Sequence, residues 1–113
     1  MVLGAGFGNR LRPLTLQLPK PAVPIANRPL AWFALDRLAQ YGITSVAVNT
    51  HHLATELVRE IEPRLPTGQE VTFVHESEIL GTGGGVKNAW KPEAGELLVV
   101  VNGDVIFAPD LDR

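Results

Sequence analysis

Short apolar runs alternate with segments of helical periodicity along most of this chain of 113 residues. Apolar residues recur on one face of residues 27–41, and again at every fourth position from Leu53 to Ile61, which predicts two helices. Strands are predicted at residues 1–3, 45–49, 70–74 and 97–101. Strands that alternate with helices indicate an α/β fold with a Rossmann-like, mostly parallel sheet and helices on both faces.

Punctuating residues predict where the helices begin and end. Asn27 is expected to cap the first helix, with Pro29 in its first turn and Gly42 as its terminator. The second helix is expected to stop at Pro63, because proline lacks the N–H that a continuing helix needs.

Three further segments have distinct patterns. Several prolines predict extended, loop-like backbone for residues 15–25. Gly81 to Gly85 is predicted to be a glycine-rich loop, followed by a short helix over residues 86–90. The unbroken apolar run of residues 97–101 predicts a central strand that is covered on both faces.

Functional-looking residues follow each predicted strand. Gly4 follows the first, residues 49–52 the second, Glu76 the third and Asp104 the fourth. Parallel α/β sheets bind ligands beyond the carboxyl ends of their strands, so these residues are expected to meet at one ligand site.

Composition excludes several classes of protein. The net charge is −2, without a run of like charges, so neither a nucleic-acid stripe nor a polybasic membrane patch is expected. The chain has no cysteine, which excludes disulfides and thiolate metal sites. No apolar run is long enough to span a bilayer, and no leader is apparent, so a cytoplasmic location is expected.

The segment after the first strand combines glycines with cations. Gly4, Gly6 and Gly8 would let backbone N–H groups approach a ligand closely. Arg10, Arg12 and, further on, Lys20 supply charge suited to phosphate oxygens. Together these residues predict a loop that holds a nucleoside triphosphate.

Two common phosphate-binding patterns fail at one position. The third glycine of a dinucleotide fingerprint and the second glycine of a Walker A loop would both fall on Asn9. A plain glycine turn is the remaining alternative, and the clustered cations argue against it.

The motif Gly4-x-Gly6-x-Gly8-x-Arg10-x-x-Pro13-x-Thr15, followed by Pro19-Lys20-Pro21, resembles the signature of the sugar-1-phosphate nucleotidyltransferases. Residues 80–85 resemble the second nucleotide-binding loop of that family, and residues 101–104 resemble its metal-binding strand end. The resemblance extends over nearly the whole chain. Asn9 departs from it, since the family usually has Thr or Ser there, and so does Gly4-Ala5-Gly6, where Ala-Ala-Gly is commoner.

The resemblance implies an incomplete nucleotidyltransferase (GT-A-like) fold. Residues 1–113 would form a single nucleotide-binding domain, the N-terminal part of a protein about twice as long. The implied reaction is attack of a sugar-1-phosphate oxygen on the α-phosphorus of an NTP, which yields a nucleotide-sugar and pyrophosphate. The sugar phosphate is already an anion, so no general base is expected.

The resemblance also assigns roles to residues. Arg10 and Lys20 would be catalytic, and Asp104 would bind Mg²⁺. The nucleotide would be bound by Gly4, Ala5, Gly6, Gly8, Asn9, Glu76, Gly81, Thr82 and Gly83. GTP and UTP are both expected as candidate nucleotides. The carboxylate of Glu76 suits guanine, whereas the Thr-Gly-Gly-Gly run is closer to the uridylyltransferases.

A different class of function remains as an alternative: a non-catalytic nucleotide-binding or regulatory fragment of the same family. One aspartate makes a weak metal site, and a second metal carboxylate is not evident. His51 and His52 are expected to line the nucleotide cleft or to begin the following helix. The sequence does not identify the sugar and leaves homo-oligomerisation open.

Overall fold

The computed structural model describes residues 1–91, 93, 96–108 and 110. Its strands are β1 (Val2–Leu3), β2 (Pro24–Ile25), β3 (Arg28–Pro29), β4 (Ser45–Thr50), β5 (Glu70–His75) and β6 (Val101–Asn102). Its helices are α1 (Leu30–Gln40), α2 (Ala54–Ile61) and α3 (Gly81–Ala89), with 3-10 turns η1 (Asn9–Leu11), η2 (Leu14–Leu16), η3 (Lys20–Ala22) and η4 (Glu62–Arg64).

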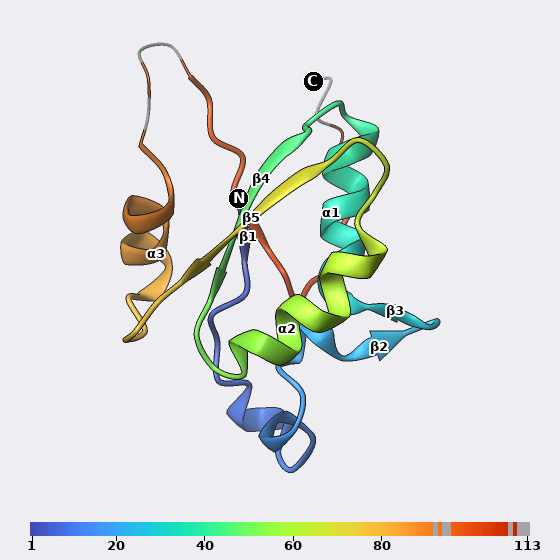
Figure 1. Ribbon diagram of the computed structural model, residues 1–113, viewed down its shortest axis with the longest axis vertical. Helices are drawn as coiled ribbons and strands as arrows, with labels where there is room; N and C mark the ends of the chain where they lie inside the picture. Colours follow the sequence, from blue (N-terminus) through green and yellow to red (C-terminus); the bar gives the residue numbers. More distant parts are fainter. Residues whose placement is uncertain (92, 94–95, 109, 111–113) are drawn as a thin grey trace.

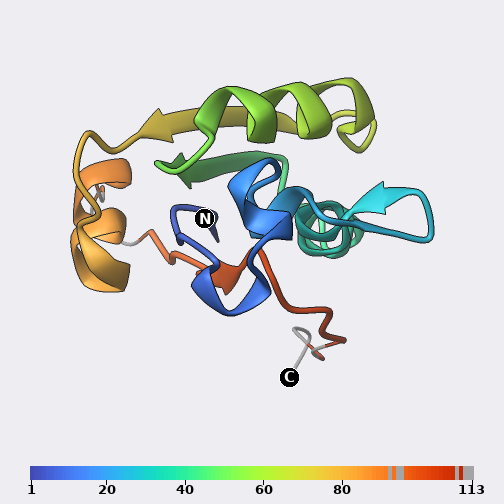
Figure 2. The ribbon, with the colours of Figure 1, turned by 90° about the horizontal axis from the view of Figure 1, so that it is seen from below.

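A four-stranded parallel sheet in the order β5-β4-β1-β6 organises the chain. Val2 of β1 pairs with Val48 of β4 on one side and with Val101 of β6 on the other. Helices α1 and α2 lie on one face of this sheet and α3 lies on the other (Figures 1 and 2). The predicted α/β architecture with helices on both faces is therefore confirmed.

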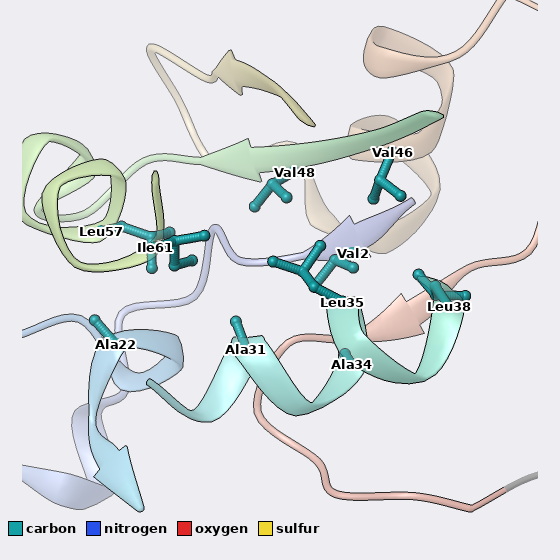
Figure 3. Close-up of a cluster of buried hydrophobic side chains, with 10 residues drawn as sticks. All are labelled: Val2, Ala22, Ala31, Ala34, Leu35, Leu38, Val46, Val48, Leu57 and Ile61. Carbon is teal, nitrogen blue, oxygen red and sulfur yellow. The ribbon is translucent and has the colours of Figure 1, made fainter. Parts of the chain in front are cut away.

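The buried core lies between the sheet and the two helices α1 and α2 (Figure 3). Alternate residues of a strand face opposite sides, so Val46 and Val48 point into this core while Asn49 points toward α3. The buried cluster consists of Val2, Ala22, Ala31, Ala34, Leu35, Leu38, Val46, Val48, Leu57 and Ile61. This packing holds β1 and β4 rigidly, and both strands end at the site described below.

The predicted start of the first helix is wrong, although its end is confirmed. Asn27 does not cap α1: together with Ala26 it forms the turn of the β2–β3 hairpin, with φ of 62° and 48°. A two-residue hairpin turn of type I′ needs both central residues in the left-handed region, which asparagine tolerates well. Gly42, with φ of 74°, follows the C-terminal end of α1 as predicted.

The second helix ends as predicted, because α2 stops at Ile61, two residues before Pro63. The extended backbone predicted for residues 15–25 is wrong in part. Short 3-10 turns interrupt this segment, such as η3, in which the N–H of Ala22 donates to the Pro19 carbonyl at 2.8 Å. A proline near the start of such a turn loses no hydrogen bond, so the prolines did not exclude it.

The glycine-rich segment from Gly81 is helical, so the predicted loop is wrong. All of residues 81–89 form α3. Two of its glycines are required by packing. A Cβ at Gly84 would lie 2.7 Å from Leu80 Cβ, and one at Gly85 would lie 2.8 Å from both Asn49 Nδ2 and Glu76 Oε1. Close approach, rather than loop flexibility, explains these two glycines.

The predicted central strand at residues 97–101 is also wrong. Only Val101 and Asn102 form β6, which lies at the edge of the sheet in the described part of the chain. Leu97 is 97% exposed and Val100 is 39% exposed. An apolar run indicates a strand that can be covered, but it does not say whether the covering element lies in the same stretch of chain.

None of the helices formed by the described residues is both long and apolar enough to cross a membrane.

Candidate functional site

A cavity of about 490 Å³ opens at the carboxyl ends of the parallel strands. Four parts of the chain line it: residues 3–11 after β1, Lys20 and Pro21, the β4–β5 side, and the end of β6. The lining residues outside the first loop are Lys20, Pro21, Asn49, Glu76, Ile79, Gly81, Thr82, Asn102 and Asp104. The structure thus brings together every residue predicted for the site except Gly83, which does not line the cavity.

The first glycine loop is held at both ends. The N–H of Gly4 donates to Asn49 Oδ1 at 2.8 Å, in a buried hydrogen bond. The carbonyl of Gly8 accepts a bond of 2.8 Å from the Thr15 hydroxyl. Gly8 has a φ of 63°, in the region that glycine adopts at little cost. Gly6, between these anchors, is exposed and lines the cavity, and among the described residues, its chain neighbours apart, no heavy atom lies within 4 Å of where its Cβ would lie.

Arg10 presents an uncompensated positive charge to the cavity. It lies in η1, is exposed and lines the cavity. Among the described residues it has no hydrogen-bond or ion-pair partner, so its guanidinium is free to bind an anion. Arg12, which the sequence grouped with it, is not among the lining residues.

Lys20 and Asp104 form an ion pair across the cavity wall. Lys20 Nζ lies 2.6 Å from Asp104 Oδ2, and the two side chains are 28% and 33% exposed. The pair joins η3 to the segment after β6, which are far apart in the sequence. Each charge neutralises the other as long as the pair is intact.

Asp104 is the carboxylate predicted to bind Mg²⁺. Within the described residues no group of three or more His, Cys, Asp or Glu side chains could hold a metal ion. Mg²⁺ commonly takes one or two protein carboxylates and completes its shell with water and substrate phosphates. One aspartate at the edge of the cavity fits that pattern as a single ligand, with Lys20 competing for the same carboxylate.

Glu76 and Asn49 form a buried pair at the base of the cavity. Glu76 is 2% exposed and Asn49 is 3% exposed. Asn49 Nδ2 donates to Glu76 Oε1 at 2.8 Å, and the N–H of Leu80 donates to Glu76 Oε2 at 3.1 Å. Both carboxylate oxygens of the residue predicted to contact the base therefore already accept a protein hydrogen bond. The sequence placed Asn49 among the strand-end residues expected at the ligand site but assigned it no individual role.

The two adjacent histidines support the cavity from outside its lining. His51 Nδ1 lies 2.7 Å from the Glu76 carbonyl, and His52 Nε2 lies 2.7 Å from the Thr15 carbonyl. In each case the ring N–H must be the donor, since a carbonyl only accepts. The Phe7 ring, which does line the cavity, packs edge-on against His51 with centroids 5.4 Å apart. Phe7, Leu11 and Ile79 are lining residues that the sequence did not single out.

The glycine loop, Arg10 and the Lys20–Asp104 pair thus meet at one cavity beside the carboxyl ends of the parallel strands. The sequence matches the Nucleotidyl transferase family over residues 1–113, and the chain belongs to that family.

The relatives are sugar-1-phosphate nucleotidyltransferases. The mannose-1-phosphate guanylyltransferase of Mycobacterium tuberculosis is 38% identical over 111 residues, which cover 98% of this chain and 31% of the relative. The UTP–glucose-1-phosphate uridylyltransferase of Synechocystis is 34% identical over 122 residues, again 98% of this chain and 31% of the relative.

A solved structure is similar over most of the described fold. HddC from Yersinia pseudotuberculosis, crystallised in complex with GMP-PN, superimposes with a TM-score of 0.77 at 31% identity, covering 91% of this chain and 46% of HddC. The chain thus spans less than half the length of each of these proteins.

Proposed function

We propose that this chain is the nucleotide-binding part of an enzyme that joins an NTP to a sugar-1-phosphate and releases pyrophosphate. The observation that carries the proposal is the cavity itself: a glycine loop and an arginine without a partner among the described residues follow β1, and they meet there a Lys–Asp pair that joins η3 to the segment after β6. Relatives named as guanylyl- and uridylyltransferases of sugar-1-phosphates support it.

The reaction needs positioning and charge more than acid–base chemistry. A phosphate oxygen of the sugar-1-phosphate forms a bond to the α-phosphorus, and the bond from that phosphorus to the bridging oxygen of the departing pyrophosphate breaks. The attacking oxygen is already ionised and pyrophosphate departs as an anion. The protein must therefore align the two phosphates and stabilise negative charge on the leaving group.

Arg10 is proposed to bind the outer phosphates. Its guanidinium presents a fork of N–H donors that can engage two phosphate oxygens, and nothing in the described chain competes for it. The open backbone around Gly6 would receive the phosphate chain beside it. Lys20 would act as a point charge near the reacting phosphates.

Asp104 is the residue that would hold Mg²⁺, which supplies positive charge to phosphate oxygens. The base is proposed to lie against the opposite wall, formed by Glu76, Ile79, Gly81 and Thr82. GTP and UTP both remain candidates, since the named relatives include enzymes for each.

Calorimetric titration of the chain with GTP and with UTP, in the presence of Mg²⁺, tests nucleotide binding. Arg10→Ala is expected to weaken binding about 10- to 100-fold, the loss that removal of charged hydrogen bonds produces. Arg59→Ala is the matched control, because Arg59 lies on α2 outside the cavity with a 66% exposed side chain. Equal affinities for the two variants would remove Arg10 from the site.

Pyrophosphate release, measured with each NTP and a panel of sugar-1-phosphates, separates the enzyme from a binding module. Release of pyrophosphate with one pair of NTP and sugar-1-phosphate supports the transferase function. Nucleotide binding without product from any pair would favour the non-catalytic fragment.

Replacing Asp104 by Asn tests the metal proposal. The substitution removes a metal ligand and at the same time releases Lys20 from its ion pair. NTP binding in EDTA is therefore expected to strengthen a few-fold, by about 1 kcal/mol or less, while the gain in affinity that Mg²⁺ gives the unchanged chain becomes smaller. An unchanged Mg²⁺ dependence would show that Asp104 is only a structural partner of Lys20.

A further inference from the structure

Two walls of the cavity come from separate parts of the sheet. The phosphate-side wall is the glycine loop after β1, and the base-side wall is the segment between β5 and α3. The strand order β5-β4-β1 places β4 between them. A single nucleotide can contact both walls at once only if the distance between the two walls is fixed.

Asn49, near the end of β4, is hydrogen-bonded to both walls. Its Oδ1 accepts from the N–H of Gly4 at 2.8 Å, and its Nδ2 donates to Glu76 Oε1 at 2.8 Å. Glu76 extends this series of hydrogen bonds, because its Oε2 accepts from the N–H of Leu80 at 3.1 Å. Three hydrogen bonds in sequence thus connect the first residue of the glycine loop to the residue before α3.

The chemistry of each group leaves only one orientation for the Asn49 amide. Its oxygen alone can accept from a backbone N–H, and its NH₂ alone can donate to a carboxylate. Because Asn49 and Glu76 are 3% and 2% exposed, water does not readily replace either bond. Gly85 of α3 packs directly on the pair, since its Cβ would lie 2.8 Å from both Asn49 Nδ2 and Glu76 Oε1.

We propose that Asn49 is a positioning residue that holds the two walls of the nucleotide site at a fixed separation, and that Glu76 acts on the nucleotide chiefly through Asn49 and Leu80. The ligand that needs this arrangement is a nucleoside triphosphate, whose phosphates and base contact different walls. The inference rests on the proposed function for its ligand, but the connection between the walls is a property of the protein alone.

A reciprocal exchange of side chains tests the connection. In Asn49→Asp, a second carboxylate faces Glu76 and the donor is lost. In Glu76→Gln, an NH₂ group replaces one of the two carboxylate oxygens, so it faces either Asn49 Nδ2 or the Leu80 N–H, donor against donor. In the double variant Asn49→Asp with Glu76→Gln, all three bonds are restored. The new carboxylate at position 49 accepts from Gly4 and from the new amide at position 76, whose oxygen accepts from Leu80.

GTP and UTP affinities of the four proteins are the measurement. Each single variant is expected to bind the preferred nucleotide about tenfold more weakly, and the double variant is expected to return to within about threefold of the unchanged chain. If Glu76 instead accepts hydrogen bonds directly from the base, the double variant stays as weak as Glu76→Gln alone, and the proposal is overturned.

Amide hydrogen exchange gives a readout that does not depend on nucleotide. In Glu76→Gln the Gly4 amide is expected to exchange faster, and in Asn49→Leu the Leu80 amide is expected to do so, although neither changed residue bonds to that amide directly. Unchanged remote amides would overturn the connection. If the unchanged chain bound neither nucleotide, the proposed function would fail, while these exchange rates would still decide whether Asn49 couples the walls.

Discussion

The two glycine-rich segments of this chain have similar composition and opposite structures. Residues 4–8 form an irregular loop that ends at a left-handed glycine and leads into a 3-10 turn. Residues 81–85 form the first turns of a regular helix. Glycine content alone therefore does not distinguish a loop from a helix; the atoms around each position explain why glycine is there.

Each segment contains packed glycines and open ones. A Cβ at Gly4 would lie 2.8 Å from the Asn49 carbonyl oxygen, and one at Gly85 would meet the Asn49–Glu76 pair at 2.8 Å. At Gly6 and Gly83, no atom of the described residues lies within 4 Å of the same position, neighbouring backbone apart. Both segments thus pack against the same residue, Asn49, from two directions.

The largest effect is expected at Gly4. Gly4→Ala should lower the free energy of unfolding by about 1–3 kcal/mol, because its methyl group meets a backbone oxygen that the β4–β5 ladder holds in place. Urea denaturation followed by circular dichroism measures this. Gly6→Ala, two residues along the same loop, is the control, with an expected change within about 1 kcal/mol. Equal losses in both variants would contradict the distinction between packed and open positions.

A smaller net loss is expected within α3, because the helix propensity of alanine offsets part of the clash. Gly83→Ala should stabilise the chain by about 0.5–1 kcal/mol, the usual gain from alanine inside a helix. Gly85→Ala has the same gain, but its methyl group clashes with Asn49 and Glu76. The free energy of unfolding of Gly85→Ala should therefore be about 1–3 kcal/mol lower than that of Gly83→Ala in the same denaturation series. Similar stabilities for the two alanine variants would show that α3 shifts away from the pair at little cost.

The features that the sequence predicted correctly are those set by local pattern and by the geometry of parallel strands. Alternating strands and helices led to the observed sheet, and Gly42 and Pro63 lie just beyond helix ends. Errors arose where a residue type has two uses. Asn27 suits both a helix cap and a left-handed turn, and only the pairing of β2 with β3 decides between them.

The site could be predicted to a similar depth. Parallel strands end at one edge, so Gly4, Glu76 and Asp104 were expected together and do line one cavity. Their contacts could not be foreseen, because the Lys20–Asp104 pair and the Asn49–Glu76 bond each join residues distant in sequence. The role inferred for Asn49 depends on strand order, which periodicity does not encode.

The position of β1 has a consequence for how the chain reaches its native state. This two-residue strand lies between β4 and β6, so its pairs join the two ends of the described chain, whereas β4 and β5 are linked locally through α2. Contacts between distant residues require a larger loss of chain entropy and form late. We therefore expect the β4–α2–β5 unit to assemble first and the glycine loop, although it precedes both in the sequence, to become ordered only when β6 has paired with β1.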